Sequence, residues 1–299
     1  MNKLVINAPA KVNLYLNLLG RRSDGYHEVE TIIQAIDICD ELTLEGARDV
    51  INISSDDPDL PAGEANLAYK AAQLLLEKSN TNRGARIFIK KQIPQAAGLG
   101  GGSSDAATTL AGLNRLWNLD ISPRRLIELG KSLGTDVPFF ISSSSTALCT
   151  GRGDDPRCLT SKTLWYCLVV PPIKVSTADV YSKMWYEASG LTRPNDDVKM
   201  LAQALKEGDL QRIRHLLYNG LERVVKDLIP VVPRVMELMK SLGADGISIS
   251  GSGPSVFSLC QNRKEAVDLA SKISSRGVWR TFVARTYQTK EVSRGNHRS

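Results

Sequence analysis

The chain has 299 residues, enough for two domains, and its hydrophobic share of 42% and charged share of 23% are those of an ordinary globular protein. Its apolar runs are shorter than the roughly 18 residues that a membrane helix needs, and its start turns polar too early for a secretory signal. The formal net charge of +6 is dispersed rather than gathered on one face, which argues against nucleic-acid binding. We expect a cytoplasmic protein with a small anionic substrate and no nucleic-acid or membrane partner.

The five cysteines and three histidines carry no metal signature. The cysteines are odd in number, widely spread and without a C-x-x-C pair, and the histidines lack the spacing of zinc ligands. The sequence therefore predicts reduced thiols and names no metal-binding residue.

The first half of the chain mixes strand and helix patterns. Alternating apolar residues predict strands over 3–8, 12–19, 29–36 and 85–91. Helices are predicted after Asn66, over 103–117, and from Ser122-Pro123 to Gly134. A polar stretch with glycines and a proline over 150–162 indicates a boundary, so we expect domains 1–160 and 161–299.

The second half repeats this mixture of patterns. It predicts strands at 164–170, 246–249, 255–259 and 278–284, and helices at 196–206, 210–228, 232–242 and 264–274, before a short flexible tail at 294–299. Antiparallel-looking strands mixed with helices favour an α+β fold over a doubly wound one.

The most informative segment is the glycine-rich stretch 94–107, Pro-Gln-Ala-Ala-Gly-Leu-Gly-Gly-Gly-Ser-Ser-Asp-Ala-Ala. Clustered glycines weaken regular structure, and these stand directly before a helix whose first turn is Ser-Ser-Asp. Bare N–H groups, hydroxyls and the positive helix end then converge where an anion binds. The segment predicts a triphosphate site, although a flexible surface connection is the plain alternative.

Two familiar phosphate loops do not match this segment. A Walker A loop needs a Gly-Lys-Ser/Thr ending, and no lysine follows these glycines. A dinucleotide loop follows the first strand of a parallel βαβ unit, whereas this segment lies in mid-domain.

Three further segments carry candidate chemistry. Lys11 and Asn13 lie two apart in a strand and so project to one face, although an isolated lysine is usually a solvated one. Asp136 stands between a helix stop and an apolar run, where a turn or cap role is equally natural. The late turn Ser-Gly-Ser-Gly-Pro at 250–254 is either a plain hairpin or a second backbone approach to phosphate.

Together these segments resemble the GHMP kinase superfamily, from about Leu4 to Ala284. Its three motifs occur in order as Pro-Ala-Lys-Val-Asn-Leu at 9–14, Gly-Leu-Gly-Gly-Gly-Ser-Ser-Asp-Ala at 98–106, and the late glycine turn. The resemblance implies a ribosomal-protein-S5-like N-terminal domain, a ferredoxin-like C-terminal domain and an active site in the cleft between them. It also implies an ATP-dependent kinase for small-molecule hydroxyls.

Segments 20–27 (Gly-Arg-Arg-Ser-Asp-Gly-Tyr-His) and 133–140 (Leu-Gly-Thr-Asp-Val-Pro-Phe-Phe) narrow the resemblance to one branch of that superfamily. The branch implies transfer of the ATP γ-phosphate, with Mg²⁺, to the 2-hydroxyl of 4-(cytidine 5'-diphospho)-2-C-methyl-D-erythritol in non-mevalonate isoprenoid synthesis. Asp136 would be the base or orienter of that hydroxyl, and Lys11 would stabilise Asp136 and the developing alkoxide.

The resemblance also implies the binding residues. Those expected to hold ATP are Pro94, Gly98, Leu99, Gly100, Gly101, Gly102, Ser103, Ser104 and Asn66. For Asn66 a plain N-cap of the helix that follows it is an equally good alternative. Those expected to hold the acceptor are Asn13, Tyr26, His27, Tyr181, Gly251, Ser252 and Gly253. Tyr26 and Tyr181 would cover the two faces of the cytosine, and His27 would bond its polar edge. No protein ligand for Mg²⁺ is named.

Some positions depart from the family pattern. Thr135 replaces an alanine, and Asp154 replaces a glutamate in a loop, 151–158, that receives no role. A homoserine or mevalonate-type kinase would lack the Gly-Tyr-His segment, and a non-catalytic nucleotide-binding regulator would not need Lys11 with Asp136. Oligomeric state is left open.

Overall fold

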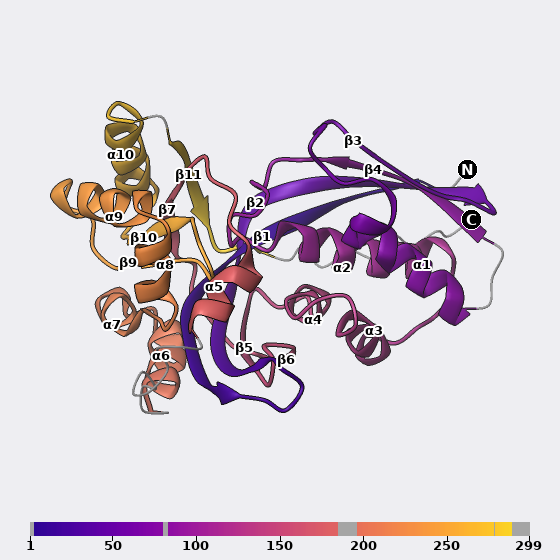
Figure 1. The fold of residues 1–299 in the computed structure, drawn as a ribbon, viewed down its shortest axis with the longest axis horizontal. Helices are drawn as coiled ribbons and strands as arrows, with labels where there is room; N and C mark the ends of the chain where they lie inside the picture. The colour runs from indigo at the N-terminus through magenta and orange to yellow at the C-terminus, as the bar shows by residue number, and fades with distance from the viewer. Residues whose placement is uncertain (1–2, 80–82, 185–195, 278, 289–299) are drawn as a thin grey trace, which may run out of the picture.

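The computed structural model describes residues 3–79, 83–184, 196–277 and 279–288. Strands and helices mix in two layered halves, each built on its own sheet (Figure 1), so the predicted α+β class is confirmed. No helix in these ranges is long and apolar enough to cross a bilayer. The tail expected at 294–299 lies outside the described residues.

The first sheet is built on two long antiparallel strands, β1 (Lys3–Arg21) and β2 (His27–Arg48). The separate strands expected at 3–8 and 12–19 are one element, because shifts of register, the first between Pro9 and Ala10, let the strand continue through its irregularities. The sheet is completed by β3 (Ile51–Ser55), β4 (Arg83–Lys90), β5 (Thr146–Thr150), β6 (Asp155–Cys158) and the two-residue β8 (Tyr218–Asn219).

Helices cover one face of this sheet (Figure 1). After the short turn η1 (Gly63–Ala65) these are α1 (Leu67–Ser79), α2 (Gly101–Leu116), α3 (Pro123–Gly130) and α4 (Val137–Ile141). The alanine-rich faces of α1 and α2 let both helices pack closely on the leucines and isoleucines of β2 and β4. The start of α2 is thereby fixed against the sheet.

The second sheet is antiparallel, in the order β11 (Arg280–Arg285), β7 (Trp165–Val170), β10 (Val256–Cys260) and β9 (Ile247–Ile249). The remaining helices surround it. They are α5 (Thr177–Met184), α6 (Asp196–Glu207), α7 (Leu210–Leu216), α8 (Glu222–Leu228), α9 (Val231–Ser241) and α10 (Arg263–Ser274).

The single helix expected over 210–228 is wrong. The chain leaves α7 at Leu216, forms β8 (Tyr218–Asn219) beside β1, and starts α8 at Glu222. The amide of Asn219 causes the break, because its Nδ2 donates to the carbonyls of Ile249 and Gly251 at 2.8 Å each. A helical continuation would leave those buried carbonyls without these partners.

The two halves share one core. Val12 and Leu14 of β1 pack in the same buried cluster as Tyr166 of β7 and Phe257 of β10. Figure 1 shows β1 and β2 passing from the helix-covered sheet into this junction, with α5 beside it. The boundary expected near residue 160 stays a prediction, but elements from both sides of it meet where the site residues gather.

Candidate active site

A cleft of about 950 Å³ lies at this junction. All but two of the residues expected from sequence line it, from both sides of residue 160. Ser104 is fully buried near the start of α2, and Gly253 is a buried residue of the late glycine turn, so these two do not line the cleft.

The glycine segment forms a tight cradle at the start of α2. Gly98 and Gly100 both have left-handed backbone, with φ of 75° and 71°. A Cβ on Gly98 would lie 2.2 Å from the Ser250 carbonyl oxygen, and one on Gly100 would lie 2.9 Å from Cγ of Lys11. Only glycine fits these positions, and the glycine backbone lines the cleft at the N-terminus of α2, a place that favours an anion.

The late glycine turn supports this cradle from the other half of the chain. The Ser250 hydroxyl donates to the Gly98 carbonyl at 2.8 Å, and the Ser255 N–H donates to the Ala97 carbonyl at 3.4 Å. On the opposite side the Lys11 N–H donates to the Leu99 carbonyl at 2.9 Å. The loop is thus held in one shape by β1 and by the turn between β9 and β10.

Lys11 and Asp136 form an ion pair beside the cradle. Lys11 Nζ lies 3.5 Å from Asp136 Oδ2, and the lysine side chain is 6% exposed whereas the carboxylate is 27% exposed. Asp136 directly precedes α4, but its side chain makes no cap hydrogen bond. The cap role that the sequence allowed is therefore absent, and a half-open carboxylate faces the cleft with a buried cation behind it.

A short relay fixes the lysine. Lys11 Nζ donates to Asn13 Oδ1 at 2.6 Å, Asn13 Nδ2 donates to Thr31 Oγ1 at 2.9 Å, and that hydroxyl donates to the Tyr15 carbonyl at 2.6 Å. Asn13 lines the cleft as expected, yet it also orients Lys11. No role for Thr31 was predicted from the sequence. Its partner Asn13 lies on the neighbouring strand, 18 residues away in the chain, and no local sequence pattern reveals such a contact.

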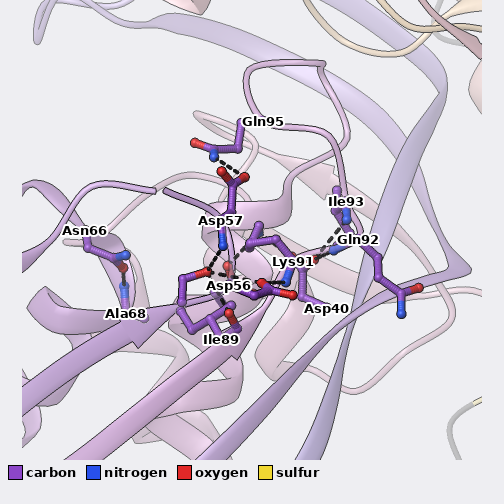
Figure 2. A network of polar contacts seen from close by, with 12 residues as sticks. Asp40, Asp56, Asp57, Asn66, Ala68, Ile89, Lys91, Gln92, Ile93 and Gln95 are labelled. Carbon is purple, nitrogen blue, oxygen red and sulfur yellow. Dashed lines mark hydrogen bonds and ion pairs between the residues drawn. The ribbon is translucent and has the colours of Figure 1, made fainter. Parts of the chain in front are cut away.

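A second buried charge cluster underlies the cradle. Lys91 binds the carboxylates of Asp40 and Asp105, the latter at 2.9 Å, and all three side chains are at most 5% exposed. Figure 2 shows Asp40 also accepting the N–H groups of Gln92 and Ile93, at 2.6 and 2.9 Å. Strand β2, the segment after β4 and the N-terminal part of α2 are thus joined at one point.

One lysine cannot neutralise two buried carboxylates. Burial disfavours the Lys91 ammonium, but the charges of Asp105 and Asp40 outweigh it and raise its pKa. Asp40 accepts the two N–H bonds as well, whereas burial raises the pKa of Asp105 to about 7, so part of the Asp105 population is protonated near neutral pH. Oδ1 of Asp105 has no hydrogen-bond partner in the described part of the chain. Sequence reasoning missed this cluster, because Asp40 and Lys91 come from separate elements.

Asn66 combines two roles. Its Oδ1 accepts the Ala68 N–H at 2.8 Å and so caps α1, and its Nδ2 donates to the Pro61 carbonyl at 2.9 Å. Figure 2 shows its contact with Ala68, and Asn66 also lines the cleft. Of the two roles expected for Asn66, the structure shows the N-cap, and contact with ATP stays a prediction.

The far end of the cleft is aromatic. The rings of His27 and Tyr181 lie 5.4 Å apart, although one comes from the start of β2 and the other from α5. Burial, with the charge of Arg21, lowers the pKa of His27, so the neutral ring offers both a donor and an acceptor. Tyr26 is 50% exposed and carries the guanidinium of Arg152 over its ring.

Comparisons with known proteins agree with this geometry. The family profile described as GHMP kinases N terminal domain matches residues 66–149, and the profile described as GHMP kinases C terminal matches 201–278. A 4-diphosphocytidyl-2-C-methyl-D-erythritol kinase of Bacillus cytotoxicus is 47% identical over 259 residues, which cover 86% of this chain and 88% of that protein. A protein of the same name from Bacillus cereus has the same identity and coverage.

The chain belongs to the GHMP kinase family. Among solved structures, a 4-(cytidine 5'-diphospho)-2C-methyl-D-erythritol kinase superposes on this GHMP kinase with a TM-score of 0.80 and 33% identity, over 94% of this chain and 98% of that one. A homoserine kinase from Cytophaga hutchinsonii has a TM-score of 0.71 at 20% identity, covering 96% and 95%. The second likeness shows the shared fold alone.

Proposed function

We propose that this GHMP kinase transfers the γ-phosphate of ATP to the 2-hydroxyl of 4-(cytidine 5'-diphospho)-2-C-methyl-D-erythritol. The observation that carries the proposal is the Lys11–Asp136 pair, at 3.5 Å, in the same cleft as a glycine cradle at a helix N-terminus. The choice of acceptor is supported by relatives of that name at 47% identity and by the aromatic end of the cleft.

The cradle residues fit a nucleotide triphosphate. The backbone at Gly98, Gly100 and Gly101 is open to the cleft, and a Cβ at each would meet neighbouring atoms within 2.2 to 3.1 Å. The N-terminus of α2 favours negative charge at this point. ATP would supply the transferred phosphoryl group here, and Asn66 would lie against the nucleoside.

The oxygen donors that line the cleft beside the cradle fit a magnesium ion. Ser103, Thr135 and Asp136 present hydroxyl and carboxylate oxygens, the kind of ligand that Mg²⁺ prefers. Most of the ion's coordination would come from phosphate oxygens and water, and the ion would neutralise charge on the phosphates.

The acceptor hydroxyl would lie against Asp136. The partly exposed carboxylate would accept the hydroxyl proton, and the Lys11 ammonium, 3.5 Å from it, would stabilise negative charge on the acceptor oxygen. Asn13 and Thr31 keep the lysine aimed at this point. Since phosphoryl transfer is mainly positioning and charge stabilisation, this rigid arrangement supplies what the step needs.

The cytidine would occupy the aromatic end. Tyr26 and Tyr181 would stack on the base, and the neutral His27 would bond its polar edge. The backbone of Gly251 and the Ser252 hydroxyl, which lies 3.0 Å from the Thr177 hydroxyl, would face the diphosphate.

An ADP-release assay tests the proposal. The protein is incubated with ATP and Mg²⁺ and with the cytidine-diphosphate methylerythritol, homoserine, mevalonate or galactose in turn. Turnover with the cytidine acceptor alone is expected. Turnover with another acceptor would retain the kinase but refute the cytidine site, and ATP binding without turnover would favour a non-catalytic regulator.

A further inference from the structure

Arg152 lies between β5 and β6, in the loop 151–158 to which the sequence analysis assigned no role. Gly151 and Gly153 on either side have left-handed backbone, with φ of 71° and 92°. The Val29 N–H of β2 donates to the Gly151 carbonyl at 2.8 Å, two residues after His27. The loop is therefore anchored to the strand that begins at the aromatic end of the cleft, and Arg152 lines that cleft.

Hydrogen bonds to Asp154 and Lys131 fix the orientation of the Arg152 guanidinium. Nε and Nη2 of Arg152 both donate to Asp154 Oδ2, at 2.9 and 2.5 Å, and Nη2 also donates to the Lys131 carbonyl at 3.1 Å. Asp154 is only 8% exposed, so this pair is stiffer than a solvated surface pair. A fixed, planar cation is thereby presented to the cleft.

That cation covers one face of Tyr26. Cζ of Arg152 lies 4.9 Å from the centre of the tyrosine ring, within the range of a cation–π contact. Tyr26 stands on the turn between β1 and β2, where its N–H bonds to Asp24 Oδ1 at 3.1 Å, and half of its surface is exposed. A ring so exposed on a turn needs a support to hold one orientation.

We propose that Arg152 is a positioning residue, which holds the Tyr26 ring so that its other face receives the base of the acceptor. The inference rests on the proposed function, because it takes Tyr26 as the stacking surface. With the ring already ordered, less side-chain freedom is lost when the base binds. The family pattern has a glutamate where this chain has Asp154. The shorter aspartate side chain still accepts the hydrogen bonds that hold the Arg152 guanidinium in place.

Four variants of the full-length protein test this inference. Three are the single variants Arg152→Met, Arg152→Lys and Tyr26→Ala, and the fourth combines Tyr26→Ala with Arg152→Met. We expect Arg152→Met to raise KM for the cytidine acceptor roughly three- to tenfold, with kcat and KM for ATP unchanged. Arg152→Lys keeps the charge but not the two-pronged bond to Asp154, so an intermediate KM is expected. Arg285→Met is the matched control, because Arg285 also pairs with an aspartate and lies 5.9 Å from the Trp165 ring, outside the cleft.

The double variant separates positioning from direct contact. If Arg152 acts through Tyr26, its loss adds less than about 1.5-fold to the KM of Tyr26→Ala. Equal fold-changes in both backgrounds would overturn the positioning role, and so would a normal KM in Arg152→Met. A normal KM in Tyr26→Ala would overturn the cytidine site as well. Calorimetric titration with CDP gives the same comparison for a folded but inactive variant.

Discussion

Replacing Lys91 by Met should destabilise the protein strongly. The lysine is the shared partner of Asp40 and Asp105, which are 0% and 2% exposed, so its loss leaves two buried carboxylates facing each other. Removing one partner of a buried ion pair costs roughly 3–5 kcal/mol. At roughly 2–4 °C per kcal/mol for a domain of 150–250 residues, this corresponds to a fall in Tm of roughly 6–20 °C.

Differential scanning calorimetry at pH 7.5 measures this effect. The double variant Lys91→Met with Asp105→Asn should recover at least half of the loss, because Asp40 keeps the N–H bonds of Gln92 and Ile93 and no longer faces a second charge. Lys174→Met is the control, since Lys174 pairs with Asp59 at 3.0 Å but both side chains are about two-thirds exposed. Its Tm should move by less than about 2 °C.

Two results would refute the reasoning. A Tm for Lys91→Met within 2 °C of the parent would mean that the cluster does not carry the energy assigned to it. A double variant no more stable than the single one would mean that the destabilisation comes from lost packing of the lysine stem rather than from uncompensated charge.

Four further outcomes are expected. Asp136→Ala should lower kcat by about 10²–10⁴-fold while calorimetry shows unchanged ATP binding; wild-type turnover would contradict the assignment. Gly98→Ala should abolish ATP binding, measured by titration, because its Cβ would strike the Ser250 carbonyl. Tyr26→Ala should raise KM for the cytidine acceptor far more than KM for ATP. Since burial raises the pKa of Asp105 from 3.8 to about 7, its contribution to stability is full below about pH 3.8 and is lost as pH rises from there through about 7, so Asp105→Asn should flatten the fall of Tm between about pH 4 and 7.

The glycine cradle at the start of α2 could be predicted from local sequence. Clustered glycines before Ser-Ser-Asp have few other uses, and the structure places Gly98 and Gly100 in backbone shapes that other residues avoid. Lys11 and Asp136 could be named only through the resemblance, since each alone suits a surface or cap role. The prediction of one long helix over 210–228 was wrong because Asn219 donates to the carbonyls of Ile249 and Gly251, which lie 30 and 32 residues further along the chain.

The sequence by itself determined the α+β class, several of the helices and strands, and the residues whose chemistry is local: the glycines of the cradle, the cap at Asn66 and the strand face shared by Lys11 and Asn13. Tertiary structure alone decided which of them meet. The relay to Thr31, the Asp40–Lys91–Asp105 cluster and the support of Tyr26 by Arg152 each join segments far apart in the chain. Periodicity and turn chemistry act over a few residues, whereas these contacts depend on how two sheets and their helices pack.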